Sequence, residues 1–140
     1  MATTGTDGDW VVKVIDVYPG DAPILSPNPQ NVRMGGFQML LAGDILRAKF
    51  RNSMSTPEPM VPESADGSCS SRSATTCHTF LKRHRVMVQI QSSWFPMFDR
   101  NPQTFVDIYH AKDSDYLSAT HKVFRSASRP SFLTLPVLDK

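Results

Sequence analysis

The amino-acid sequence predicts an all-β sandwich. Three observations favour this fold class. The apolar segments are short and rich in β-branched and aromatic residues, long proline-containing connections separate them, and no segment has the spacing of a convincing amphipathic helix. The 140 residues are 40% hydrophobic and 20% charged. Such a composition is typical of one globular domain, so residues 1–140 are expected to form a single domain.

The first predicted strand is Trp10–Tyr18, with the sequence WVVKVIDVY. It is apolar on both faces, which suits a strand that is covered on both sides within a sandwich. Pro19–Asp21 has the chemistry of a turn and ends this strand. The following segment, Asp21–Gly36, contains three prolines, each of which lacks a backbone donor, so a loop is predicted there.

Gly43 separates the next two predicted strand segments, Phe37–Ala42 and Asp44–Phe50. The pattern predicts a hairpin or a bent pair of strands around the glycine. In the second segment, apolar residues alternate with Arg47 and Lys49. One face should therefore be buried and the other wet, with Lys49 on the wet face.

The clearest period of two in the chain lies in Arg85–Ser92, which predicts a strand with Val, Val and Ile on one face. A long connection interrupted by two prolines follows, from Ser93 to about Leu117, and one or two helical turns are expected in Ala111–Ser118. Two short strands, His121–Arg125 and Phe132–Leu138, are predicted to close the chain.

The segment Glu63–Cys77 (ESADGSCSSRSATTC) has a different composition from the rest of the chain. It is rich in Ser, Thr and Cys and has no aliphatic residue beyond alanine. Such a segment buries too little apolar area to offset the entropy cost of ordering its backbone. We expect a disordered insert or an aberrant stretch at residues 63–77, and the least ordered region of the chain.

Charge and hydropathy narrow the classes of partner. The net charge is only +2 and the basic residues are scattered, so no nucleic-acid partner is expected. No apolar window approaches the length of about 18 residues that a membrane span needs, so no membrane partner is expected. The N-terminus has no basic segment followed by an apolar run, so no signal peptide is predicted. The sequence does not identify the cellular compartment, and the cytoplasm is the default expectation.

Four segments resemble, in the same order, parts of the C-terminal domain of the α-amino-acid ester hydrolases, a family that includes cocaine esterase, glutaryl-cephalosporin acylase and X-Pro dipeptidyl-peptidase. The segments are Gly5–Pro23, Met34–Ser53, Gln89–Phe105 and Ala119–Leu138. The resemblance implies a jelly-roll β-sandwich of the galactose-binding-domain type. It also implies a partial domain, incomplete at its N-terminus, because the family's domain is longer and this chain begins partway through it.

What the resemblance implies about function is a non-catalytic domain that packs on and orients an α/β-hydrolase catalytic domain. In the relatives the catalytic domain is part of the same chain. For this chain, association with a separate catalytic domain is an open alternative. One alternative is a separately encoded part of an active ester or peptide hydrolase complex. Another is a carbohydrate-binding jelly-roll module, which rests on fold analogy alone.

The family attacks esters and amides with a serine in a GxSxG turn, and this chain contains no GxSxG. No catalytic residue is therefore predicted, and the chain is expected to be inactive alone. A triad of Ser93 with His110 or His121 and an aspartate (Asp99 or Asp107) would be a chance combination.

Two apparent metal motifs are also incomplete. Cys69, Cys77, His78 and His84 have zinc-ligand chemistry but not the usual ligand spacing. The acidic pair at positions 113 and 115 lacks the glycine and glutamate of a calcium loop, and is expected to be a solvated loop or a helix cap. No metal and no cofactor are predicted.

The block SSWFPMFDRNPQTF is the predicted functional surface. Its large aromatic side chains lie in a proline-broken loop, where local structure cannot bury them all. A loop folded back on its own sandwich through an internal Asp–Arg network is one interpretation. The other is a surface that docks on the catalytic domain, formed by Trp94, Phe95, Phe98, Asp99, Arg100 and Asn101.

Overall fold

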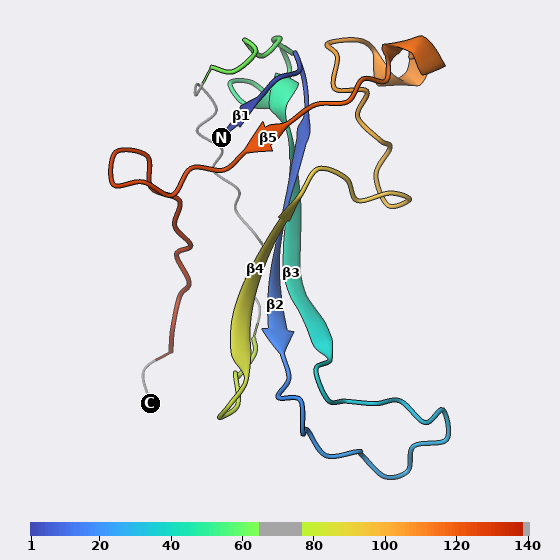
Figure 1. Ribbon diagram of the computed structural model, residues 1–140, viewed down its shortest axis with the longest axis vertical. Helices are drawn as coiled ribbons and strands as arrows, with labels where there is room; N and C mark the ends of the chain where they lie inside the picture. The colour runs from blue at the N-terminus through green and yellow to red at the C-terminus, as the bar shows by residue number, and fades with distance from the viewer. Residues whose placement is uncertain (65–76, 139–140) are drawn as a thin grey trace.

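The computed structural model describes residues 1–64 and 77–138 (Figure 1). Within these ranges the regular structure is almost all β. The strands are β1 (Ala2–Thr3), β2 (Asp9–Val17), β3 (Gln38–Arg47), β4 (Arg85–Gln91) and β5 (His121–Lys122). Three single-turn 3-10 helices are η1 (Ala48–Phe50), η2 (Ile108–His110) and η3 (Asp113–Asp115).

The described strands form two antiparallel sheets. One has the order β3-β2-β4, and the other pairs β1 with β5. Figure 1 shows the three-stranded sheet as a tall twisted ribbon, with the β1–β5 pair near one end and the β2–β3 loop at the other. This architecture confirms the predicted all-β class and is consistent with a β-sandwich.

Strand β2 is the central strand of the larger sheet, and its sequence explains that position. Its β-branched residues favour extended backbone and pack well on a pleated surface. Val11, Val14, Ile15 and Val17 are all buried. Val14 faces one side of the sheet and the other three face the opposite side, so β2 contributes apolar area to both sides, as its two-sided apolar pattern predicts.

Of the two alternatives predicted at Gly43, a hairpin or a bent pair of strands, the hairpin is wrong, because β3 is one continuous strand that pairs with the whole of β2. The bend is a β-bulge: Val14 pairs with Ala42 but Ile15 pairs with Leu40, so Leu41 is an extra residue. Gly43 pairs with Lys13 inside the sheet. Its missing side chain leaves the space that a distant aromatic ring fills, as shown below.

The prediction that Lys49 lies on a wet strand face is also wrong. The strand ends at Arg47, and Ala48–Phe50 forms the 3-10 turn η1. This turn rotates both Ala48 and Lys49 into the interior, where Lys49 is only 9% exposed. Its backbone N–H donates to Asp7 Oδ1 at 3.0 Å and its Nζ donates to the carbonyl of Val106 at 3.1 Å.

Strand β4 is an edge strand in the described sheet, since it pairs with β2 alone. The prediction that Val86, Val88 and Ile90 share one face is confirmed by their pairing with alternate residues of β2. All three are exposed. The described sheet therefore presents an apolar strip along its β4 edge.

The last predicted strand, Phe132–Leu138, is wrong. This segment has no strand pairing, and Phe132, Val137 and Leu138 are almost fully exposed. Its apolar residues have strand propensity, but a strand also needs backbone hydrogen-bond partners, and none of the described strands pairs with this segment. The preceding predicted strand shortens to the two residues of β5.

Most of the segment expected to be a disordered insert, residues 65–76, lies outside the described residues, and so does Cys69. Its described ends hold specific positions. The Glu63 N–H donates to the carbonyl of Thr3 at 2.7 Å, which places the start of the segment beside β1. Cys77 at the other end is an exposed free thiol.

Candidate functional site

The aromatic loop, defined here as Trp94–Asn101, begins where Trp94 folds back on the three-stranded sheet. The Trp94 ring covers Gly43: a Cβ added at Gly43 would lie 2.6 Å from the ring atom Cη2. Any side chain at position 43 would therefore displace the ring. On the same face, the Lys13 ammonium lies 4.5 Å from the centroid of the Trp94 ring, a cation–π contact.

The tip of the aromatic loop is a tight turn with apolar side chains on the outside. The Phe98 N–H donates to the Trp94 carbonyl at 3.1 Å, and the two rings lie 5.9 Å apart. The Phe95–Pro96 peptide bond is cis. Phe95 is 63% exposed and Met97 is 67% exposed. The tip therefore combines a defined backbone with uncovered apolar area.

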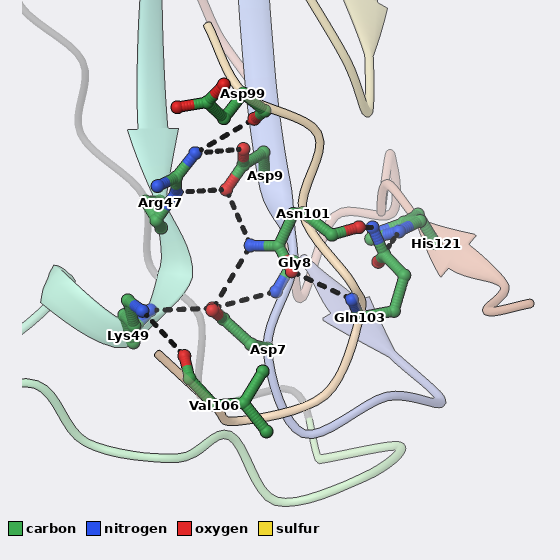
Figure 2. A network of polar contacts seen from close by, with 10 residues as sticks. All are labelled: Asp7, Gly8, Asp9, Arg47, Lys49, Asp99, Asn101, Gln103, Val106 and His121. Carbon is green, nitrogen blue, oxygen red and sulfur yellow. Dashed lines mark hydrogen bonds and ion pairs between the residues drawn. The ribbon is translucent and has the colours of Figure 1, made fainter. Parts of the chain in front are cut away.

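Arg47 fixes the far end of the aromatic loop to the sheet. Its guanidinium makes a bidentate pair with Asp9, at 3.1 Å from Nε to Oδ1 and 3.2 Å from Nη2 to Oδ2. The same Nη2 also donates to the backbone carbonyl of Asp99 at 3.1 Å. One charged side chain of β3 thus joins β2 to the loop, and Figure 2 shows this arrangement.

Asn101 makes the most buried contacts of the aromatic loop and is only 6% exposed. Its Nδ2 donates to Asp7 Oδ2 at 3.1 Å and to Asp9 Oδ1 at 2.8 Å. Its Oδ1 accepts from the Gln103 N–H at 2.8 Å. The amide uses both its donor and its acceptor, so the side-chain orientation is fixed and the loop leaves the sheet at one defined point (Figure 2).

Asp7 is fully buried at the centre of this network. Burial raises the pKa of the Asp7 carboxyl, because it disfavours the charged form, and donors from Gly8, Asn101 and Lys49 oppose that rise. The Gly8 N–H donates to Asp7 Oδ1 at 2.8 Å, the same oxygen that accepts from the Lys49 backbone. The carboxyl group holds together the turn before β2 and the turn after β3.

His121 extends the network to β5. Gln103 donates from Nε2 to the carbonyl of Asn101 at 3.1 Å, so its Oε1 faces His121. His121 Nε2 lies 2.8 Å from that Oε1 and must therefore carry the proton. Burial lowers the pKa of the His121 imidazole, although the nearby Asp9 charge opposes this, and the ring is neutral at neutral pH. Close packing surrounds it: a Cβ on Gly8 would lie 2.7 Å from its Cε1.

Arg100 lines a groove of about 280 Å³ together with Asn101 and Gln103 of this network. Its guanidinium carbon lies 5.9 Å from the Phe95 ring centroid and 5.5 Å from the Tyr116 ring centroid. Ser92 and His121 also line this groove. The two aromatic rings restrict the position of the Arg100 side chain.

The residues predicted for the docking surface thus divide by role. Trp94 lies on the sheet, Phe95 and Phe98 are exposed at the tip, and Arg100 lines the groove. Asp99 joins the internal network through its backbone carbonyl, and Asn101 through its side chain. The ion pair that holds the loop joins Asp9 to Arg47, and within the described residues Asp99 and Arg100 form no ion pair with each other.

Sequence reasoning missed Asp7, Asp9 and Arg47 as anchors of the loop. One signal for them was present: two acidic residues sit at the start of the most apolar strand of the chain, where an unpaired carboxylate would be costly. Their partners lie about 40 and 90 residues away in sequence, and nothing local identifies them.

A second buried polar cluster lies at the other end of β2. Asp16 is 1% exposed and accepts from His78 Nε2 at 2.9 Å and from His84 Nδ1 at 2.9 Å. Burial raises the pKa of the Asp16 carboxyl, but the hydrogen bonds from the two imidazoles outweigh it, so the pKa is lowered overall. Two members of the incomplete zinc motif therefore meet at a carboxylate. No group of metal-ligating side chains able to hold an ion occurs in residues 1–64 and 77–138.

The other clusters considered from sequence have structural contacts. Ser93 Oγ accepts from the Phe95 N–H, and within the described ranges no serine hydroxyl bonds to a histidine. His110 pairs with Asp107 at 2.6 Å on the surface. Asp115 caps η3 by accepting from the Lys112 N–H at 2.8 Å, as the cap interpretation predicts. None of the described helices has the length and hydropathy of a membrane span.

Comparisons with known proteins agree with this architecture. The family model for the X-Pro dipeptidyl-peptidase C-terminal non-catalytic domain matches residues 1–134. Cocaine esterase from Rhodococcus sp. (strain MB1 Bresler) is 25% identical over 140 residues, which is 100% of this chain and 22% of the esterase.

Two solved structures are also similar, each with a TM-score of 0.74 over 92% of this chain and 20% of the matched chain. One is an aminopeptidase from the marine sediment archaeon Thaumarchaeota archaeon, at 42% sequence identity. The other is an α-amino acid ester hydrolase labelled with selenomethionine, at 43% identity.

The chain belongs to the family of X-Pro dipeptidyl-peptidase C-terminal non-catalytic domains. It spans about one fifth of the length of the relatives it matches, in which the domain is the C-terminal part of a larger hydrolase. The family resemblance seen in the sequence is thereby confirmed.

Proposed function

We propose that this domain packs on and orients an α/β-hydrolase catalytic domain, and that the aromatic loop is the docking surface. The observation that carries the proposal is the contrast between the two ends of the loop. Its base is fixed by buried hydrogen bonds from Asn101, whereas Phe95 and Met97 at its tip are more than 60% exposed.

Such a loop is organised for binding before a partner arrives. Association normally costs entropy when loops and side chains become ordered. Here Arg47 and Asn101 already hold the backbone, so docking the tip would cost little further ordering. Large aromatic side chains at the centre of an interface also supply most of its binding energy.

The experiment uses the α-amino acid ester hydrolase that is 43% identical to this chain, from which the matching fifth is removed. This trimmed hydrolase is mixed with the 140-residue chain, and affinity is measured by calorimetry alongside ester hydrolysis. We expect binding, recovery of hydrolysis, and no turnover by the chain alone. Recovery in trans would also support a separately encoded part of an active complex.

Phe95→Ala should weaken this association by about 2 kcal/mol, roughly thirtyfold in Kd, because it removes an exposed aromatic anchor. Met54→Ala is the matched control, since Met54 is 81% exposed in a different loop. Equal affinities for the wild-type chain and Phe95→Ala would remove the aromatic loop from the interface. Absence of binding by the wild-type chain would contradict the packing role itself.

A further inference from the structure

Arg100 differs from Arg47, Arg51 and Arg83, whose guanidinium groups have polar partners in the structure. Arg47 pairs with Asp9, Arg83 pairs with Asp21, and Arg51 donates to three backbone carbonyls. Among residues 1–64 and 77–138, no carboxylate lies within 4.0 Å of the Arg100 guanidinium and no acceptor binds its N–H groups. Its described contacts are with the rings of Phe95 and Tyr116.

These two rings lie near the Arg100 guanidinium but do not provide hydrogen-bond acceptors for its N–H groups. An arginine binds an aromatic ring through the flat face of the guanidinium, and this leaves the N–H groups along its edge available. The rings of Phe95 and Tyr116 limit the rotamers of Arg100, so less entropy is lost when its N–H groups acquire a partner. The N–H groups of Arg100 are thus available to an acceptor on another molecule.

We propose that Arg100 binds the carboxylate of an aspartate or glutamate on the catalytic domain. This inference rests on the proposed docking function and names the chemistry of the partner surface. A carboxylate matches the fork of a guanidinium through two parallel hydrogen bonds. Ser92 and Tyr116 line the same groove and supply hydroxyl groups at its wall. Exposed Leu117 lines the groove and exposed Phe95 lies near the Arg100 guanidinium, so docking would cover apolar area there.

The charge of the groove favours a carboxylate over a phosphate. Arg100 is the one cationic side chain among the described residues that line it. His121 also lines the groove, but its Nε2 proton is committed to Gln103 and burial keeps the ring neutral at neutral pH. A single guanidinium balances a single negative charge, whereas phosphate sites usually gather several donors or cations.

The first test measures binding of the full 140-residue chain to the trimmed hydrolase as a function of salt. Arg100→Gln should weaken binding about tenfold or more and flatten its salt dependence, because the charge pair is lost. The affinity of Arg100→Lys should lie between those of the wild-type chain and Arg100→Gln, because an ammonium keeps the positive charge but cannot form two parallel hydrogen bonds. Arg129→Gln is the control: Arg129 lies over the single ring of Phe124 and does not line this groove.

The outcomes separate this inference from the docking function. If Phe95→Ala weakens binding but Arg100→Gln matches the wild-type affinity and salt slope, the loop docks without a carboxylate at Arg100. If the wild-type chain does not bind the trimmed hydrolase, both proposals are wrong.

A second test uses the chain alone, with acetate as the probe. The side-chain Nε–H signal of Arg100 is followed by NMR while sodium acetate replaces sodium chloride at constant ionic strength. We expect a saturable shift at Arg100 that exceeds the shift at Arg129. A shift in acetate without any effect of Arg100→Gln on docking would assign the site to free carboxylates and overturn the inference about the catalytic domain. Equal, unsaturable shifts at both arginines would show that the groove has no preference for carboxylates.

Discussion

Asn101 illustrates how one side chain decides whether the aromatic loop has a defined structure. Its Nδ2 is shared by two buried carboxylates, Asp7 and Asp9, and its Oδ1 holds the backbone of Gln103. Asn101→Ala removes a donor from both carboxylates while they stay buried, and a buried charged group without its partner is costly. We expect the free energy of unfolding to fall by about 3 kcal/mol, measured by urea denaturation.

The matched control for Asn101→Ala is Asn52→Ala. Asn52 also donates to a carboxylate, Glu58 Oε2 at 2.8 Å, but that pair is exposed. Its removal should change the free energy of unfolding by about 0.5 kcal/mol or less. Equal losses for the two variants would show that the network around Asn101 is no more important than a surface contact.

Among the elements, β4 carries the clearest liability. Its apolar face is exposed and its outer backbone edge has no partner among the described strands. Exposed apolar edges of this kind favour association of chains. We expect the isolated chain to self-associate, and Val88→Lys to reduce that association over a protein concentration series in sedimentation velocity. Lysine is tolerated at edge strands, so the stability cost should stay below about 1 kcal/mol.

Met54→Lys controls for the added charge in this comparison, because Met54 is an exposed apolar residue far from β4 in sequence. A wild-type chain that stays monomeric at every concentration would contradict the liability of β4. So would an equal effect of the two lysine substitutions, since that would indicate a general effect of charge.

Across the elements, sequence predicted what local chemistry determines and missed what distant contacts determine. The β-branched run of β2 and the alternation of β4 identify these strands without any partner. The break at Gly43 was misinterpreted because its space is filled by Trp94, 51 residues later. The aromatic loop was identified from its exposed aromatics, whereas its anchors on Asp7, Asp9 and Arg47 depend on tertiary pairing.

At the scale of the whole molecule, three buried groups contribute to the dependence of stability on pH, with different signs. Asp16 has a lowered pKa despite burial. Its stabilising contribution is fully present above its ordinary pKa of 3.8, and it is lost as pH falls through the pKa of the folded state. Burial raises the pKa of Asp7, so ionisation of Asp7 opposes folding and that penalty is relieved in acid. Burial lowers the pKa of His121, so His121 favours the folded state only while it is neutral.

A comparison of the wild-type chain with His121→Gln isolates the effect of His121, because both chains contain the same aspartates. In the unfolded chain His121 binds a proton near its ordinary pKa of 6.5, whereas in the folded chain it does so only at lower pH. The contribution of His121 to the free energy of unfolding should therefore fall as pH falls below about 6.5. His121→Gln keeps a donor for Gln103 but cannot titrate, and His78, His84 and His110 are common to both chains. The difference in unfolding free energy between wild type and variant should thus shrink or reverse from pH 8 to pH 5, as measured by urea denaturation. A difference that stays constant, or that grows in favour of wild type in acid, would contradict burial of a neutral imidazole between Gly8 and Gln103.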